Sequence, residues 1–151
     1  MTIRPFQDGD LADYLRMAGV FYASDATITQ VDPKQFIRTY EKTLEQSPFV
    51  KGLMLLEEDG RPVGYCIVTY GWYNEFGGMV VTIEELYLEE DCRSKGYGSQ
   101  VLEWIRQEHR KDFIALKLEV CRKNPRAMAL YERLGYQPLD YLQMYLPLQE
   151  A

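Results

Sequence analysis

The sequence predicts a mixed α/β (α+β) fold in a single domain that spans residues 1–151, and three observations support this prediction. The length of 151 residues suffices for one hydrophobic core and is too short for two ordinary domains. Two apolar segments, residues 50–57 and 63–70, are joined by a connector with an Asp-Gly pair, which is a strong hairpin signal. Residues 80–120 then read as strand, helix and strand, an order that implies a right-handed parallel crossover.

The N-terminal third should contain one strand and two helices. Residues 2–6 have a strand-like pattern, and Asp10 can cap a helix whose apolar residues recur with a helical period. A second helix should start at Asp32 and Pro33, because aspartate is a good N-cap and proline fits the first helical position. It should end at residues 47–48, where a Ser-Pro pair interrupts the pattern.

The segment 71–79 is expected to be a loop that leads from the hairpin into the next strand. It carries three aromatic side chains, which are Trp72, Tyr73 and Phe76. These side chains could line a pocket for a substrate, or they could seal the end of the hairpin core. We favour the second interpretation, because aromatic side chains are large apolar surfaces that cores use readily.

Residues 80–101 are the stretch around which the chain is organised. Residues 80–88 form an apolar, β-branched run that is typical of a buried strand, and an acidic connector follows. A turn with Gly96 and Gly98 then opens an amphipathic helix. Such a turn gathers unpaired backbone N–H groups at a helix N-terminus, which suits a phosphate or a pyrophosphate.

Other phosphate-binding signatures fit this turn less well. A dinucleotide fingerprint needs a third glycine at the position where this chain has Val101. A nucleoside-triphosphate loop needs Gly-Lys-Ser/Thr after a four-residue gap from its first glycine, and the sequence lacks that arrangement. A nucleotide-dependent oxidoreductase is therefore the weaker interpretation.

The last third should hold a strand, a helix and two short strands. Residues 113–120 are mostly apolar and read as a strand. Asn124 as N-cap and Pro125 at the first position should begin a helix, and Gly135 is its natural C-terminal stop. Two short closing strands are expected at residues 136–138 and 141–146.

The net charge and the apolar pattern argue against several classes of protein. A formal net charge of −6 argues against nucleic acid as the main partner and favours cationic small molecules or peptides. No stretch approaches the roughly twenty apolar residues of a membrane span, and the N-terminus lacks a secretory segment. We therefore expect a cytoplasmic protein with no membrane partner and no nucleic-acid partner.

Cysteine and histidine give no sign of a metal site. Cys66, Cys92 and Cys121 are odd in number and lack metal-ligand spacing, so reduced thiols are expected, as in a cytoplasm. The single histidine, His109, falls on the polar side of its predicted helix and is expected to be a solvated surface residue. A zinc site or a histidine-based triad is therefore disfavoured, and no metal is expected.

Two blocks of sequence follow one another in the second half of the chain. The first reads Ile-Glu-Glu-Leu-Tyr-Leu at 83–88 and Arg-Ser-Lys-Gly-Tyr-Gly at 93–98. The second reads Asn-Pro-Arg-Ala at 124–127 and Leu-Tyr-Glu-Arg-Leu-Gly-Tyr at 130–136. Together they resemble the cofactor half of the GNAT superfamily of acetyl-CoA-dependent N-acetyltransferases over about sixty residues. The chain departs from the family in residues 89–92, which are more acidic than usual and lack the proline that is often found there.

The resemblance implies a fold and an acetyl donor. The fold would be a mixed, mostly antiparallel twisted sheet with a central strand-helix-strand unit, flanked by about four helices. Acetyl-CoA would be the cosubstrate, with its pyrophosphate against the glycine turn and its pantetheine arm along the strand 80–88. The implied cofactor-binding residues are Leu86, Tyr87, Leu88, Arg93, Ser94, Lys95, Gly96, Tyr97, Gly98, Ser99, Asn124, Ala127 and Tyr131.

The resemblance also implies three catalytic residues, Glu84, Glu85 and Tyr131. An amine attacks a thioester only as the free base, and a nearby carboxylate can take its proton. Because side chains alternate along a strand, only one glutamate should share a face with the cofactor; the analogy with polyamine-type acetyltransferases favours Glu84, and a bulge could reverse this parity. Tyr131 would protonate the leaving thiolate, although its place on the apolar stripe of a helix is also that of a core tyrosine.

We expect direct acetyl transfer in a ternary complex, since no cysteine or serine with a partnered base is evident. The acceptor would be a primary amine bound between residues 25–32, residues 71–79 and the acidic pair. A polyamine, an aminoglycoside, a lysine-like group or an N-terminal amine would suit; a small molecule is favoured over a protein, and a homodimer is left open. The alternative function is a non-catalytic acyl-CoA-binding sensor or regulatory module, which would need neither Tyr131 nor a carboxylate base.

Overall fold

The computed structural model describes residues 1–24, 27 and 31–148. Its strands are β1 (Thr2–Pro5), β2 (Val50–Leu56), β3 (Pro62–Tyr73), β4 (Gly78–Leu88) and β5 (Ala115–Leu118). Its helices are α1 (Leu11–Tyr22), α2 (Pro33–Leu44), α3 (Tyr97–His109) and α4 (Pro125–Arg133), with a short 3-10 helix at Glu90–Cys92. None of the described helices is long and apolar enough to cross a membrane.

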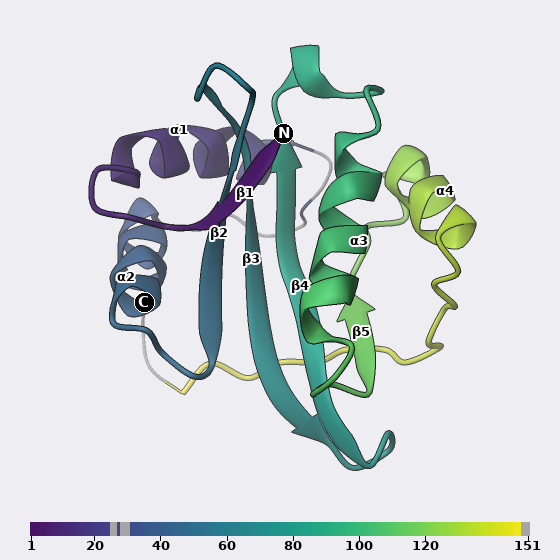
Figure 1. Cartoon of the computed structure of the whole chain (residues 1–151). Coiled ribbons are helices and arrows are strands. Elements are labelled where there is room, and N and C mark those ends of the chain that lie inside the picture. The colour runs from purple at the N-terminus through teal and green to yellow at the C-terminus, as the bar shows by residue number, and fades with distance from the viewer. Residues whose placement is uncertain (25–26, 28–30, 149–151) are drawn as a thin grey trace.

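A single sheet in the order β1-β2-β3-β4-β5 forms the centre of the described chain (Figure 1). Its first four strands are antiparallel neighbours, whereas β5 runs parallel to β4. Parallel neighbours cannot be joined by a tight turn, and α3 supplies the longer connection between them. The predicted fold class, a mixed and mostly antiparallel sheet with a central strand-helix-strand unit and flanking helices, is confirmed.

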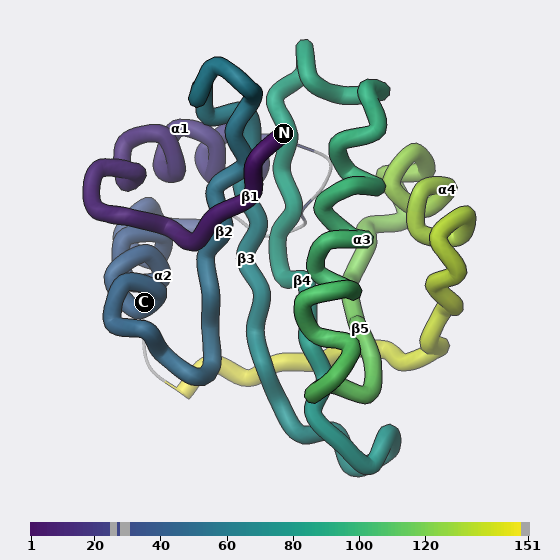
Figure 2. The backbone as a smooth tube through the Cα atoms, viewed as in Figure 1, coloured from purple at the N-terminus to yellow at the C-terminus, as the bar shows by residue number. Residues whose placement is uncertain are grey.

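Helices cover both faces of the sheet and create two apolar cores (Figures 1 and 2). On one face, α1 and α2 pack onto the sheet through a cluster that includes Tyr14 and Tyr65. On the other face, α3 packs through Val101 and Ile105, and side chains of α4 join the same cluster. Full burial of side chains of this size contributes about 1.5–3 kcal/mol each, which fixes α3 against the central strands.

The predicted loop over residues 71–79 is wrong for most of its length. β3 continues to Tyr73 and β4 begins at Gly78, so that only residues 74–77 form the turn. Aromatic residues favour strands, and Trp72 pairs across the ladder with Met79. The hairpin therefore continues through Gly71 to Tyr73.

The C-terminal strands also differ from the prediction. β5 covers only Ala115–Leu118 and not the whole of 113–120, because its partner β4 diverges beyond Ile83. Residues 136–138 and 141–146 lie outside every strand that the structure describes. Most of their side chains are exposed, such as Leu142 at 89%, and β-propensity has effect only where a partner strand is present.

Two of the three predicted helix caps are confirmed. The Asp32 carboxylate accepts a hydrogen bond from the Lys34 N–H at the start of α2, and Asn124 Oδ1 accepts one from the Ala127 N–H at the start of α4. Asp10 is not a side-chain cap, because its carboxylate accepts hydrogen bonds from the Arg4 guanidinium and the Gln7 N–H. Gly135 follows α4 with φ +89°, as expected of a helix stop.

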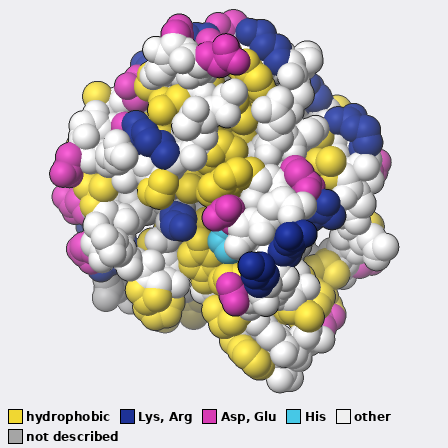
Figure 3. Space-filling view, viewed as in Figure 1, with side chains coloured by type: hydrophobic (Ala, Val, Ile, Leu, Met, Phe, Trp, Pro, Cys, Tyr) yellow, Lys and Arg dark blue, Asp and Glu magenta, His cyan; other side chains and the backbone are white. Residues whose placement is uncertain are grey.

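His109 is buried, and the prediction of a solvated surface residue is wrong. Its Nδ1 lies 2.8 Å from the carbonyl oxygen of Ile105, and its Nε2 lies 3.2 Å from the Tyr70 hydroxyl. The rings of Tyr70 and Phe113 lie against the imidazole, so that only a small cyan patch reaches the surface in Figure 3. Two hydrogen bonds satisfy the ring at the end of α3, which gives this histidine a structural place.

Candidate active site

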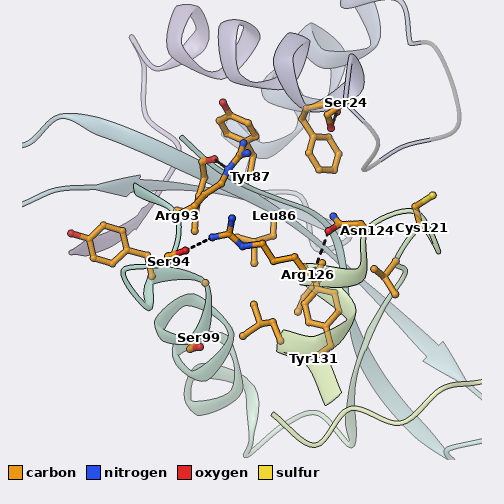
Figure 4. A pocket seen from close by; sticks show the side chains of 18 of the residues that line it. Ser24, Leu86, Tyr87, Arg93, Ser94, Ser99, Cys121, Asn124, Arg126 and Tyr131 are labelled. Atoms are coloured by element: carbon orange, nitrogen blue, oxygen red, sulfur yellow. Dashed lines mark hydrogen bonds between the residues drawn. The ribbon is translucent and has the colours of Figure 1, made fainter. Parts of the chain in front are cut away.

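A pocket opens where β4, the turn before α3 and the start of α4 meet (Figure 4). All but two of the fifteen residues predicted from the sequence line it. They are Glu84, Leu86, Tyr87, Leu88, Arg93, Ser94, Gly96, Tyr97, Gly98, Ser99, Asn124, Ala127 and Tyr131. The two exceptions, Glu85 and Lys95, have other surroundings, described below.

The pocket exists because β4 and β5 separate. Their parallel pairing covers Val80–Ile83 opposite Ala115–Leu118 and goes no further among the described residues. From Glu84 to Leu88, β4 therefore has no strand on this side, and its backbone N–H and C=O groups border the pocket. An unpaired strand edge of this kind can hydrogen-bond an extended, amide-containing chain, because such a chain presents the same donors and acceptors as a strand.

The turn before α3 has the geometry of an anion-binding loop. Ser94 has φ +65° and Gly96 has φ +82°, so two left-handed residues alternate with Lys95 just before the helix begins at Tyr97. Backbone in this form turns successive N–H groups towards one concavity, and the first N–H groups of α3 have no intrahelical acceptor. At Gly98, a Cβ would lie 3.2 Å from Leu130, which makes glycine the residue that lets α4 approach.

Basic side chains surround this turn in different ways. Arg93 donates from Nε to the carbonyl oxygen of Leu88, and its guanidinium carbon lies 5.7 Å from the centre of the Tyr87 ring. Lys95 is absent from the pocket lining in the described chain, and its ammonium lies 3.8 Å from the Glu57 carboxylate. Its predicted contact with the cofactor therefore has no support in the geometry.

The first turns of α4 close the opposite wall. Asn124 uses its side chain to cap the helix, and the same residue and Ala127 line the pocket. One turn later, Tyr131 packs against the core cluster of α3 and also lines the pocket, so a place in the core is compatible with contact to a ligand. Burial raises the pKa of Tyr131 above its usual value. Its phenol therefore stays protonated near neutral pH and can donate a proton.

The two glutamates of β4 have different environments. In the ladder, Glu85 pairs with Ile67 and Ile83 pairs with Val68, so Glu84 is the extra residue of a bulge. Glu84 is exposed, lines the pocket and accepts a hydrogen bond of 2.6 Å from the Thr69 hydroxyl. Of the pair, Glu84 is therefore the carboxylate that a substrate can reach.

Glu85 is partly buried on the side of the sheet that α1 covers, where it binds two tyrosines. The hydroxyls of Tyr22 and Tyr65 donate to its two carboxylate oxygens, at 2.8 and 2.6 Å. Burial raises the pKa of Glu85, the two hydrogen bonds oppose this, and the nearby Glu84 charge adds to it. Because Tyr22 lies in the last turn of α1, this network ties the helix end to β4. Its surroundings are those of a structural carboxylate.

The acceptor end of the pocket is only partly described. Phe21 and Ser24, at the end of α1, line it and were not predicted. Of the predicted acceptor segment 25–32, residues 25–26 and 28–30 lie outside the described residues. Trp72, Tyr73 and Phe76 are absent from the described lining; they lie at the hairpin tip, with Trp72 67% exposed. An aromatic acceptor wall at 71–79 therefore has no support in the geometry.

Several other lining residues escaped the sequence analysis for identifiable reasons. Arg126 and Leu130 stand inside the Asn-Pro-Arg-Ala and Leu-Tyr blocks, so their positions were available as a signal. Glu119 and Cys121 follow β5 and line the space left where β4 and β5 separate. No pattern in their own segment predicts this separation. No local pattern marks Phe21, because a helix end far away in sequence brings it there.

Comparisons with known proteins agree with this geometry. The pattern of the acetyltransferase (GNAT) family matches residues 20–136. The chain is 29% identical over 151 residues to thialysine N-epsilon-acetyltransferase of Bos taurus, covering 92% of this chain and 85% of that protein. It is 30% identical over 138 residues to an uncharacterized N-acetyltransferase of Archaeoglobus fulgidus, covering 87% of this chain and 89% of that protein.

Solved structures share the fold at low sequence identity. A possible acetyltransferase from Clostridium difficile 630 superposes with a TM-score of 0.80 at 20% identity, covering 99% of this chain and 98% of the other. Aminoglycoside N-acetyltransferase AAC(6')-Iy in complex with CoA superposes with a TM-score of 0.78 at 14% identity, covering 98% and 95%. At these identities the likeness concerns the fold.

Proposed function

The chain belongs to the acetyltransferase (GNAT) family and is an acetyl-CoA-dependent N-acetyltransferase, and we propose that its acceptor is the primary amine of a small cationic molecule of the lysine or thialysine type. The observation that carries this proposal is the position of Glu84. Its carboxylate stands on a bulge at the border between the unpaired edge of β4 and the open side of the pocket. A carboxylate there can attract an ammonium group and then accept its proton.

The pocket fits acetyl-CoA as the donor. The left-handed turn at Ser94 and Gly96 offers backbone N–H groups for the pyrophosphate. The unpaired edge of β4 from Glu84 to Leu88 offers a strand partner to the amides of the pantetheine arm. A pantetheine arm bound along β4 would bring the thioester into the pocket that Glu84 and Tyr131 both line.

The reaction then needs three services from the chain. Glu84, directly or through one water, takes a proton from the ammonium so that the nitrogen lone pair can attack the thioester carbon. Backbone N–H groups of β4 stabilise the negative charge that develops on the carbonyl oxygen. When the C–S bond breaks, the Tyr131 hydroxyl protonates the departing thiolate. The nitrogen gives up its second proton as the amide forms, and this proton returns Tyr131 to the phenol. The proton on Glu84 passes to solvent, so that the products are the N-acetylated amine, CoA and one proton.

The chemistry of the related enzyme and the charge of the chain support a small cationic acceptor. Thialysine and lysine each carry a side-chain amine on a flexible arm, and the related enzyme from Bos taurus takes its name from thialysine. An acidic protein with net charge −6 and an exposed Glu84 attracts such cations.

The free thiols of Cys66, Cys92 and Cys121 suit a reducing cytoplasm, which we propose as the location of the protein.

The test is a titration followed by an amine screen. The purified protein is titrated calorimetrically with acetyl-CoA, with NADH and ATP as controls, and thialysine, lysine, spermidine and an aminoglycoside are then offered with mass-spectrometric detection of the acetylated product. Saturable binding of acetyl-CoA alone and acetylation of thialysine or lysine are expected. Tyr131→Phe should retain acetyl-CoA affinity and lose most of kcat, because it removes only the proton donor. Acetylation confined to spermidine or the aminoglycoside would overturn the acceptor proposal.

A further inference from the structure

Arg126, like Arg93, contacts a neutral acceptor near the glycine turn, but it does so from α4, on the opposite wall of the pocket. Its Nη2 donates a hydrogen bond of 2.6 Å to the hydroxyl of Ser94, which is a neutral acceptor. Lys95, by contrast, lies beside the carboxylate of Glu57. Within the described residues, no ion pair involves Arg126. Its charge is therefore not neutralised by a described carboxylate.

The side chain of Arg126 reaches from one wall of the pocket to the other. It starts in the first turn of α4 and extends to the turn before α3, where the dashed line in Figure 4 joins it to Ser94. Both residues line the pocket. A ligand seated on the turn would therefore lie next to the guanidinium.

The chemistry of the guanidinium favours a phosphate over the hydroxyl it now contacts. It has five N–H donors in a planar fork, and the Ser94 hydroxyl engages one of its nitrogens. Phosphate oxygens carry negative charge and can accept two of these donors at once, so a phosphate adds a charge–charge attraction and a second hydrogen bond that the neutral Ser94 hydroxyl does not offer. A phosphate on the turn can thus replace Ser94 as the partner of Arg126.

We propose that Arg126 is a further cofactor-binding residue, whose guanidinium leaves the Ser94 hydroxyl and binds the pyrophosphate of CoA. The pyrophosphate is then held from two sides, by backbone N–H groups of the turn and by a charged side chain of α4. This inference rests on the donor site under Proposed function, and it adds a contact that the backbone alone does not provide.

Binding of CoA and dephospho-CoA, measured calorimetrically, tests the proposal without any acceptor. Dephospho-CoA keeps the pyrophosphate and lacks the 3′-phosphate. Arg126→Ala should weaken both ligands about tenfold or more, the scale of one lost hydrogen bond to a charged group. A loss confined to CoA would move the contact to the 3′-phosphate and overturn the assignment.

A double-mutant cycle separates phosphate binding from a merely structural bridge. If Arg126 acts by fastening α4 to the turn, its removal from a Ser94→Ala background should cost no further affinity. If it binds the pyrophosphate, Arg126→Ala should cost about as much in that background as in the wild type. Circular dichroism and thermal melting check that each variant is folded.

Arg122→Ala is the matched control, because it removes one positive charge near the same helix from a residue outside the described pocket lining. It should change either affinity less than about twofold, as expected of a screened surface charge. An equal loss in Arg122→Ala and Arg126→Ala would reduce the effect to general electrostatics and refute the contact. Wild-type protein that fails to bind CoA would refute the donor site itself, whereas wild type and Arg126→Ala binding equally well would refute this inference alone.

Discussion

The donor side and the acceptor side of the pocket are built in opposite ways. The donor side comes from two short stretches of sequence and works largely through backbone: the edge of β4 with the left-handed turn at 94–96, and the start of α4. The acceptor side is assembled from distant side chains, such as Phe21 at the end of α1 and Glu119 after β5. Backbone recognition needs glycines and caps at fixed spacings, so it leaves a motif. The acceptor-side residues are far apart in the sequence, so they leave no local motif.

The largest effect is expected where the two sides meet. Glu84→Gln keeps the shape of the bulge residue and removes the base, so kcat should fall by about 10²–10⁴-fold, the usual range for a general base. The affinity for acetyl-CoA should stay near that of the wild type, since the donor edge is backbone. Steady-state kinetics and calorimetry measure the two quantities. A comparable fall in Glu85→Gln with an active Glu84→Gln would exchange the roles assigned to the pair.

Binding of CoA on the donor side should be lost most readily by a substitution that disturbs the backbone of the glycine turn. Gly96→Glu places a side chain at φ +82° and adds negative charge where phosphates are expected, so CoA affinity should fall about tenfold or more. Gly9→Glu is the matched control, because Gly9 also has positive φ, at +99°, with open space around it and no place in the described pocket lining. Calorimetry that found equal losses in the two variants would attribute the effect to backbone strain alone.

The buried carboxylate should appear in the pH dependence of stability and not of chemistry. Burial raises the folded-state pKa of Glu85, so between its ordinary pKa of 4.5 and this raised value only the folded state keeps the proton. Its contribution to the free energy of unfolding therefore decreases as the pH rises through that window. Glu85→Gln should lack this slope in denaturant titrations at a series of pH values. Parallel slopes in the two proteins would show that Glu85 is not a titrating core group.

The smallest effect is expected at the hairpin tip. Trp72→Ala removes a large side chain that is 67% exposed and outside the described pocket lining. The KM for the amine should change less than about twofold, as for a surface substitution away from the site. A severalfold rise in this KM would restore the segment 71–79 to the acceptor site.

Much of the fold was readable from the sequence because local signals agreed with the tertiary structure. The Asp-Gly hairpin, the caps at Asp32 and Asn124 and the stop at Gly135 are local rules, and each holds. Most of the errors concern long-range partners; the Asp10 cap is the exception, because its carboxylate binds Arg4 and Gln7 nearby in the sequence. The segments 136–138 and 141–146 have strand composition, but pairing depends on a neighbouring strand that no local pattern specifies.

The site divides in the same way. Thirteen predicted residues line one pocket, because twelve of them belong to two motif blocks that the β4-α3-β5 unit brings together and Ser99 directly follows the first block. The environments of Glu84 and Glu85 could not be assigned, since alternation gives opposite faces but does not locate the bulge. His109 was misplaced for a related reason: Tyr70, whose ring and hydroxyl contact it, comes from β3, far away in the sequence, and Phe113 from just beyond the end of α3.

The bulge at Glu84 also bears on how such a protein can change over evolutionary time. Because Glu84 stands outside the regular ladder and its side chain is exposed, replacing it alters the chemistry of the pocket and removes an exposed hydrogen bond from Thr69, but takes no side chain out of the core. Its neighbour Glu85 has no such freedom, since two tyrosines depend on it. Substitutions at position 84 can therefore change which acceptor is used at little cost to folding, whereas Glu85 must stay to preserve its contacts with the two tyrosines.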